Sequence, residues 1–229
     1  MAKFAYSILP FGDNAIVLNF GNVVSRVINR FIHDFHLTLN TKPILGYLSS
    51  IPAYTTLTIV FDKDLTNAEQ FRKAVREIKP TADTITTANK ISIPVCYEAE
   101  YGLDMDEVCR LCSLTREEII SIHTSIVYDV YMMGFQPGFA YLGLVDERIM
   151  VPRKSKPRQN IFRNAVGLAG IQTGIYPTES PAGWQIIGCA AIDVFNIHAT
   201  DPFLIHNGDQ IEFYSISKYE YEEMNKILP

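Results

Sequence analysis

Three stretches in the second half of the chain are rich in Gly and Pro: GFQPGFAYLGL (134–144), VPRKSKPR (151–158) and QTGIYPTESPAGWQIIG (172–188). Gly and Pro at this density specify turns and close approaches of the backbone rather than the periodic packing of helices. Short apolar runs that are typical of strands surround these turns, at residues 128–133, 166–171, 184–195 and 211–214. Many short strands and little helix after residue 125 predict a closed, barrel-like β domain.

The residues before this region indicate the start of the same domain. Residues 91–97 alternate as a strand does, and residues 104–112 and 115–123 are typical of two short helices. Thr115 and Glu118 form a capping-box pattern at the start of the second helix.

Residues 1–80 have the mixed pattern of a small α+β domain. Its strands are expected at residues 4–9, 15–20, 44–51 and 55–61. Apolar residues at three- and four-residue spacing predict a helix over 24–35, and Thr66 with Glu69 predicts a capping box at the start of a second helix, which Pro80 ends. Residues 81–89 have little to bury and are interpreted as a linker, which gives two domains, 1–80 and 90–229.

The composition is typical of a soluble, well-packed protein. The chain has 229 residues, of which 48% are apolar, and no apolar run approaches the roughly 20 residues that a membrane span needs. Pro10, Gly12 and Asp13 interrupt the apolar run that a signal peptide requires. Three of the four cysteines lie in one half of the chain, which is typical of reduced cytosolic thiols rather than of a secreted disulfide framework. We therefore expect a cytoplasmic protein with reduced thiols and no membrane partner.

The net charge of −5 is unevenly distributed along the chain. Residues 1–88 carry nine basic and seven acidic side chains, whereas residues 89–229 carry 11 basic and 18 acidic ones. A basic segment, residues 148–163, contains no acid and six cations: Arg148, Arg153, Lys154, Lys156, Arg158 and Arg163. Such a segment in an acidic domain would focus potential on a small anion or an acidic partner. A nucleic-acid partner is not expected, because it needs a domain-wide basic face; a solvated basic loop is the alternative.

Sequence motifs for metals and nucleotides are missing. Cys109 and Cys112 form a single C-x-x-C pair, but zinc needs four ligands, so we expect core thiols and no metal site. There is no G-x-x-x-x-G-K-[ST] phosphate loop, no dinucleotide fingerprint and no G-x-S-x-G nucleophile elbow. If a nucleotide is used, another chain is expected to supply its site.

His123 is the histidine with the most distinctive position. It ends a predicted helix and precedes the strand that begins at Tyr128. A helix C-terminus favours a protonated imidazole, so His123 is interpreted as a structural cap or, alternatively, as a proton-transfer residue.

Aromatic residues occupy turns of the 134–188 region, where loops are normally polar. Held on rigid turns near Arg153 and Arg158, they predict a groove with cationic ends for a carboxylate or phosphate. The alternative is that the aromatic side chains close the ends of the barrel and the arginines are solvated. The candidate substrate-binding residues are Phe135, Gly138, Phe139, Tyr141, Gln172, Tyr176, Pro177 and Trp184.

These motifs, together with NGDQIEF (207–213), resemble the family of 5-oxoprolinase B subunits. That family includes the kinase A inhibitor KipI, allophanate hydrolase subunit 1 and the first half of a urea carboxylase carboxyltransferase domain. The resemblance covers nearly the whole chain and implies a small α+β domain joined to a cyclophilin-like β-barrel. It also implies two partners, a C-type barrel subunit and an A-type subunit. Together such subunits open 5-oxoproline to glutamate with ATP hydrolysis, the ATP being supplied through the complex.

Three motifs depart from the family pattern. The usual Pro-Ala-Gly-Ser is replaced by residues 162–165 (FRNA), Pro-Gly-Gly-Trp by residues 181–184 (PAGW), and Gly-Arg-Thr-Pro by residues 188–191 (GCAA). Asn164 is expected to keep a positive φ in place of the glycine, because Asn tolerates that region better than most residues. Arg163 is a candidate to replace the lost cation. These changes bear on catalysis more than on the fold.

The leading hypothesis is that the chain is the B-type subunit of an ATP-dependent 5-oxoprolinase. In it, Arg153 and Arg158 anchor an anionic group, Tyr141, Tyr176 and Trp184 shape the pocket, and His123 is a candidate for proton transfer. The second hypothesis is a KipI-like, non-catalytic inhibitor of a sensor histidine kinase. The third is half of a biotin-dependent carboxyltransferase that acts on urea or a similar amide.

Overall fold

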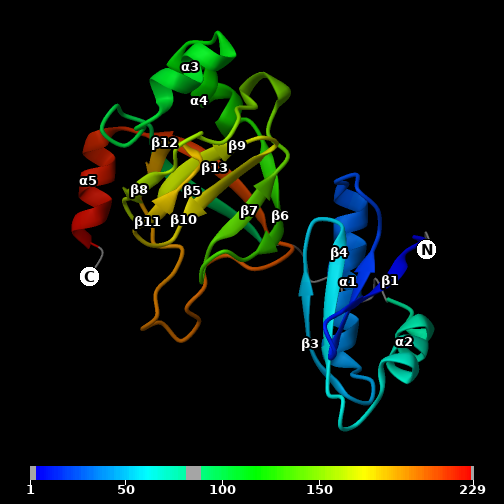
Figure 1. Cartoon of the computed structure of the whole chain (residues 1–229). Coiled ribbons are helices and arrows are strands. Elements are labelled where there is room, and N and C mark those ends of the chain that lie inside the picture. Colours follow the sequence, from blue (N-terminus) through cyan, green and yellow to red (C-terminus); the bar gives the residue numbers. More distant parts are fainter. Residues whose placement is uncertain (1–3, 81–88, 228–229) are drawn as a thin grey trace. The chain divides into compact units, whose positions relative to one another are not determined.

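A computed structural model describes residues 4–80 and 89–227 of the chain (Figure 1). The chain divides into two compact units, residues 1–87 and 88–229, and each is described by itself. Of the interpreted linker 81–89, residues 81–88 lie outside the described residues.

The first unit is a four-stranded antiparallel sheet with two helices packed on one face. The strand order is β1-β2-β4-β3, with bounds β1 (Ser7–Phe11), β2 (Ala15–Asn19), β3 (Tyr47–Pro52), β4 (Thr56–Phe61), α1 (Arg26–Thr41) and α2 (Ala68–Glu77). Alternate residues of β4, Leu57, Ile59 and Phe61, are buried against apolar side chains of both helices, because successive side chains of a strand point to opposite faces. This unit has the expected α+β composition.

The second unit contains a closed seven-stranded barrel in the order β10-β7-β6-β13-β5-β12-β9 (Figure 1). The strands are β5 (Lys90–Cys96), β6 (Val127–Met133), β7 (Ala140–Gly143), β9 (Ala165–Ala169), β10 (Gln172–Tyr176), β12 (Gln185–Ala190) and β13 (Gln210–Ile216). β13 and β5 pair in parallel, and the other neighbours are antiparallel. The remaining elements are α3 (Met105–Cys112), α4 (Arg116–Thr124), η1 (Glu147–Ile149), β8 (Arg158–Ile161), β11 (Ser180–Ala182) and α5 (Lys218–Ile227). The expected fold class, an α+β domain followed by a closed β-barrel, is confirmed.

Side chains from the two faces of the barrel wall form separate cores. Inward-facing residues from all seven strands pack together with α3 and α4. Outward-facing residues of β7, β9, β10 and β12 form a second cluster with the short β8–β11 pair. The alternation is clear in β7, where Ala140 and Leu142 face the inner core and Tyr141 packs on the outer cluster.

Local signals differ in how well they predicted the helices. The Thr115–Glu118 capping box of α4 is confirmed, with both of its reciprocal hydrogen bonds present. The Thr66 box is wrong, because Asn67 is the N-cap of α2 and accepts from two backbone N–H groups. Helix α5 was not expected, because its sequence lacks a clear apolar stripe; the Ser217–Glu220 capping pattern before it was the available signal.

Candidate functional site

The outer face of the barrel has a floor made by two glycines. The strand register places Tyr141, Gly174, Gly167 and Ile186 side by side across β7, β10, β9 and β12. Trp184 lies on this floor, because a Cβ on Gly174 would come within 3.2 Å of its ring and a Cβ on Gly167 within 3.1 Å of its Cβ. The absence of side chains at these two positions therefore makes room for the only tryptophan.

Five of the six aromatic side chains in residues 134–188 meet on this floor and are named the aromatic cluster: Phe135, Phe139, Tyr141, Tyr176 and Trp184. The ring centroid of Phe139 lies 4.8 Å from Tyr141, 4.9 Å from Tyr176 and 5.5 Å from Trp184. All of these pairs are edge-to-face, the geometry that the quadrupoles of aromatic rings favour. Phe139, Tyr176 and Trp184 are buried. The surface that the cluster offers to a ligand is therefore the half-buried Tyr141 and the exposed Phe135.

Phe135 has an unusual backbone conformation. Its φ is +69°, and the Gln136 N–H donates to the Gly134 carbonyl across it at 2.9 Å. This is a γ-turn of the rare, strained kind, because a bulky residue is disfavoured at positive φ. The side chain is 66% exposed and touches the cluster edge-on through Phe139. Strain of this kind is concentrated at functional sites.

Arg153 places a cation next to the aromatic cluster. Its guanidinium lies over Gly183, where an added Cβ would come within 3.1 Å of Nη2. Burial raises the pKa of Tyr141 and raises the pKa of Tyr176 to about 12, and the charge of Arg153 partly opposes both shifts. Within the described residues, Arg153 has no hydrogen bond or ion pair. It is therefore available to an anionic ligand.

Most other cations of the basic segment have carboxylate partners from the same chain. Four of them form ion pairs: Arg148 with Asp146, Lys154 and Arg158 with Asp104, and Arg163 with Asp193. Arg158 donates to Asp104 Oδ1 at 2.6 Å, so an internal carboxylate occupies part of its guanidinium, and its expected role as an anchor for an anion stays a prediction. Among the described residues of the segment, Arg153 and Lys156 have no ion pair. The anionic partner of the segment is thus largely Asp104, a residue that sequence reasoning did not single out.

His123 lies in the barrel core and away from the aromatic cluster. It is fully buried, and burial lowers its pKa to about 3. The Thr173 hydroxyl donates to the Gly167 carbonyl at 3.0 Å, so its oxygen accepts from His123 Nε2–H at 2.9 Å. Nδ1 then accepts from the Tyr97 hydroxyl at 2.8 Å. A neutral imidazole with both nitrogens occupied serves the core, and burial outweighs the helix C-terminus that was expected to favour protonation.

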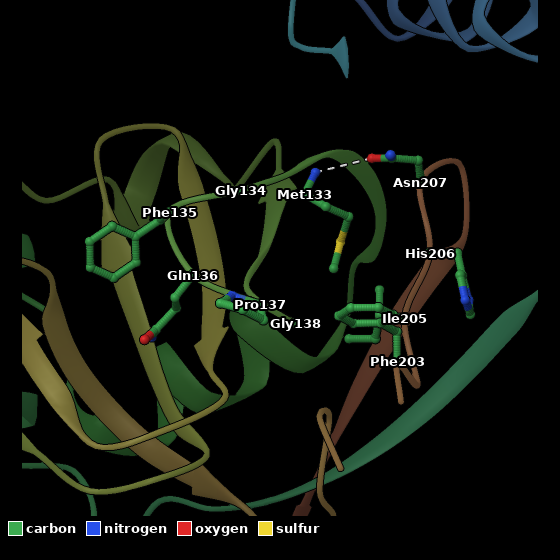
Figure 2. Close-up of a pocket in the computed structure, with 10 residues that line it drawn as sticks. All are labelled: Met133, Gly134, Phe135, Gln136, Pro137, Gly138, Phe203, Ile205, His206 and Asn207. Atoms are coloured by element: carbon green, nitrogen blue, oxygen red, sulfur yellow. Dashed lines mark hydrogen bonds between the residues drawn. The ribbon is translucent and has the colours of Figure 1, made fainter. Parts of the chain in front are cut away.

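A cavity of about 480 Å³ lies beside the loop of residues 134–138 (Figure 2). Its other side is formed by Phe203, Ile205, His206 and Asn207. Asn207 Oδ1 accepts from the Met133 N–H at 3.0 Å and ties the two sides together. Figure 2 shows the Phe135 ring directed away from Ile205 and Phe203. The same loop therefore borders the cavity and carries Phe135 to the aromatic cluster.

The remaining candidate residues, Gly138, Gln172 and Pro177, lie in a turn, a strand and a loop of the second unit. Gly138 has φ +84°, and a Cβ there would come within 2.7 Å of Phe195 and 3.3 Å of Pro177. Gln172 opens β10 and pairs with Gly143 and Ala169. Substrate binding by Gly138, Gln172 and Pro177 stays a prediction.

The residues that depart from the family pattern form their own contacts. Asn164 keeps a positive φ of +61°, as expected, and its Nδ2 donates to Asp193 Oδ1 at 2.9 Å. Arg163 is paired with the same Asp193, so it does not supply a free cation. Cys189 Sγ contacts the Tyr221 hydroxyl of α5 at 3.2 Å, and burial raises its thiol pKa to about 12.

Neither a metal-binding group of side chains nor a membrane-spanning helix is present in the ranges 4–80 and 89–227. No group of three or more His, Cys, Asp or Glu side chains is arranged there to hold a metal ion. No helix in these ranges is long and apolar enough to cross a membrane.

Comparison with known proteins gives consistent matches. A family model described as "Carboxyltransferase domain, subdomain C and D" matches residues 6–205. The 5-oxoprolinase B subunit of Bacillus subtilis is 37% identical over 228 residues, which cover 94% of this chain and 95% of that protein. The 5-oxoprolinase B subunit of Haemophilus influenzae is 43% identical, with 90% and 96% covered. The crystal structure of TTHA0988 matches with a TM-score of 0.80 and 32% identity over 89% of this chain, which spans only 40% of that chain.

Proposed function

Because this chain belongs to the carboxyltransferase domain, subdomain C and D, family, we propose that it is the B-type subunit of an ATP-dependent 5-oxoprolinase complex. The observation that carries this proposal is the match to proteins named as 5-oxoprolinase B subunits along nearly the full length of both chains. Such a name implies a role in a multi-subunit enzyme. We assign a C-type barrel subunit and an A-type subunit to this complex as partners, as the resemblance of the motifs implies.

The geometry of the aromatic cluster supports a small anionic substrate. 5-Oxoproline carries one carboxylate on a five-membered lactam ring. The Arg153 guanidinium is free for two parallel hydrogen bonds to a carboxylate. Tyr141 lies beside Trp184 on the floor and offers a half-buried ring for the apolar edge of the lactam.

Two further candidates are given structural roles in this proposal. Arg158 is held by Asp104, and His123 is buried and neutral. Neither residue is assigned a contact with the ligand in this proposal. The groups that activate the lactam and bind ATP are therefore assigned to the partner chains, and this chain has no phosphate-loop motif.

Reconstitution with the A-type and C-type partners tests this proposal. We expect 5-oxoproline-dependent ATP hydrolysis to require this chain, and Arg153→Ala to raise KM for 5-oxoproline about 10-fold or more, as expected for a lost hydrogen bond to a charged group. Arg148→Ala is the matched control, because it removes a cation of the same segment that is paired with Asp146. The proposal would be refuted if ATP hydrolysis with 5-oxoproline did not change when this chain is omitted, or when Arg153 is replaced by Ala.

A carboxyltransferase role is the second candidate, and the description of the matching family favours it. Biotin dependence separates the two functions. Transfer of a carboxyl group from a biotinylated carrier to urea by the complex, without turnover of 5-oxoproline, would select the carboxyltransferase. Inhibition of a sensor histidine kinase stays a prediction from the sequence.

A further inference from the structure

Asp104 is a buried carboxylate at the junction of the segments that carry the candidate site. Its side chain is 3% exposed. It occupies the N-cap position of α3 but makes no capping hydrogen bond to that helix. An aspartate at this position normally accepts from the backbone N–H groups of its own helix. The hydrogen-bond partners of the carboxylate therefore lie outside α3.

The Asp104 carboxylate accepts hydrogen bonds from β12 and from the basic segment. Oδ1 accepts from Lys154 Nζ at 2.5 Å and from Arg158 Nη2 at 2.6 Å. Oδ2 accepts from the Ile186 backbone N–H at 2.9 Å and from Arg158 Nε at 3.3 Å. Burial raises the pKa of Asp104, but these hydrogen bonds outweigh it and hold the pKa below its ordinary value. The carboxylate is charged and its oxygens are fully occupied.

These contacts fix the immediate neighbours of the two site residues. Lys154 follows Arg153 directly, and its backbone N–H donates to the Gly183 carbonyl at 2.8 Å. Ile186 lies two residues after Trp184, and its carbonyl accepts from the Asp104 backbone N–H at 2.8 Å. Asp104 thus holds the chain on both sides of the Arg153–Gly183 contact.

We infer that Asp104 is a positioning residue, which keeps the Arg153 guanidinium and the Trp184 indole in register for one anionic substrate; its role in turnover rests on the proposed function. Asp104 does not touch the ligand and acts through Lys154, Arg158 and Ile186. Without its charge, the two cations lose their partner, and the side-chain link between the segment that carries Arg153 and the Ile186 backbone N–H is weakened.

NMR of the full chain tests the positioning without any activity. Trp184 is the only tryptophan, so its indole N–H signal is unambiguous, and the Arg153 Nε–H signal is assigned by its loss in Arg153→Ala. We expect Asp104→Asn to shift and broaden both signals. Asp146→Asn, which removes the carboxylate partner of Arg148 in the same segment, should leave both in place. Unchanged signals in Asp104→Asn would overturn the inference.

Kinetics of the assembled complex test the consequence for turnover. We expect Asp104→Asn to raise KM for 5-oxoproline about 10-fold or more, with a smaller effect on kcat, because a hydrogen bond to the substrate charge is misaligned. In the Arg153→Ala background, Asp104→Asn should add no further increase, since both changes remove one interaction. Additive effects would show that Asp104 does not act through Arg153.

The two proposals fail in different ways. If the wild-type complex does not turn over 5-oxoproline, or if Arg153→Ala leaves KM unchanged, the proposed function fails, and the NMR signals alone decide the role of Asp104. If Asp104→Asn does not fold, Lys154→Met is measured in its place, because it removes one of the hydrogen bonds to Oδ1 and keeps the aliphatic stem. Unmoved Trp184 and Arg153 signals in that variant would equally overturn the inference.

Discussion

The buried neutral His123 predicts that the barrel loses stability in mild acid. Its pKa is lowered from 6.5 to about 3 by complete burial. In the unfolded chain the imidazole takes up a proton below about pH 6.5, whereas in the folded barrel it stays neutral until about pH 3. The stability from this residue is therefore complete above pH 6.5 and is lost as the pH falls toward 3.

The size of this loss follows from the shift. One pKa unit corresponds to about 1.4 kcal/mol, so His123 alone should remove about 3 kcal/mol of unfolding free energy between pH 7.5 and pH 4.5. The His123→Gln variant cannot take up this proton. Between pH 7.5 and pH 4.5, the unfolding free energy of the variant should therefore decrease by about 3 kcal/mol less than that of the wild type. At pH 7.5 the variant should be less stable by about 1–3 kcal/mol, because the Tyr97–His123–Thr173 hydrogen bonds are disturbed.

The assay is urea unfolding of both proteins at several pH values, followed by Trp184 fluorescence. Trp184 is the only tryptophan and lies in the second unit, so the signal reports the barrel. Carboxylates are common to both proteins, and their titration cancels in the difference. Parallel plots of unfolding free energy against pH for wild type and His123→Gln would refute the reasoning.

Three further substitutions test other parts of the barrel. Gly174→Ala should destabilise the barrel by about 1–3 kcal/mol and shift Trp184 fluorescence, since the new Cβ would lie 2.8 Å from the Ala140 carbonyl oxygen. An unchanged melting temperature and emission spectrum would contradict the claim that Gly174 makes room for Trp184. In thermal melts, Asn164→Ala should lower the free energy of unfolding by about 1 kcal/mol more than Asn164→Gly does. Both variants lose the hydrogen bond to Asp193, but only Ala is strained at φ +61°. Equal decreases in the two variants would argue against strain. Thr115→Ala should cost about 1 kcal/mol in urea unfolding by removing the cap of α4, and no loss would show that the box is dispensable.

The sequence predicted the elements whose signals are local. Turn residues and alternating strands indicated the barrel, and aromatic residues on Gly- and Pro-rich turns indicated the cluster that Phe139 and Trp184 form. The positive φ of Asn164 followed from the glycine that the resembling family carries at this position and from the tolerance of Asn for that region. These features depend on neighbours in the chain, which a single sequence displays.

Long-range pairing could not be predicted in the same way. Asp104 lies 50 residues before Lys154 and 54 before Arg158, and nothing in its local pattern distinguishes it from an ordinary helix N-cap. Without that partner the basic segment looks like a surplus of positive charge. The buried state of His123 was missed for a related reason, because its hydrogen-bond partners are distant in sequence: Tyr97 directly follows β5, and Thr173 lies in β10.

The internal pairing of the basic segment also bears on which anions reach the site. Four of its six cations are satisfied by carboxylates of the same chain, and the protein as a whole carries a net charge of −5. A polyanion approaching this surface would gain one or two local contacts and meet repulsion from the rest of the molecule. The substrate of the proposed function is a small monoanion, which carries less charge into that field. If its carboxylate binds Arg153 as proposed, we expect the protein to prefer it over polyanions by total ligand charge, and added salt to reduce this preference by screening the repulsion.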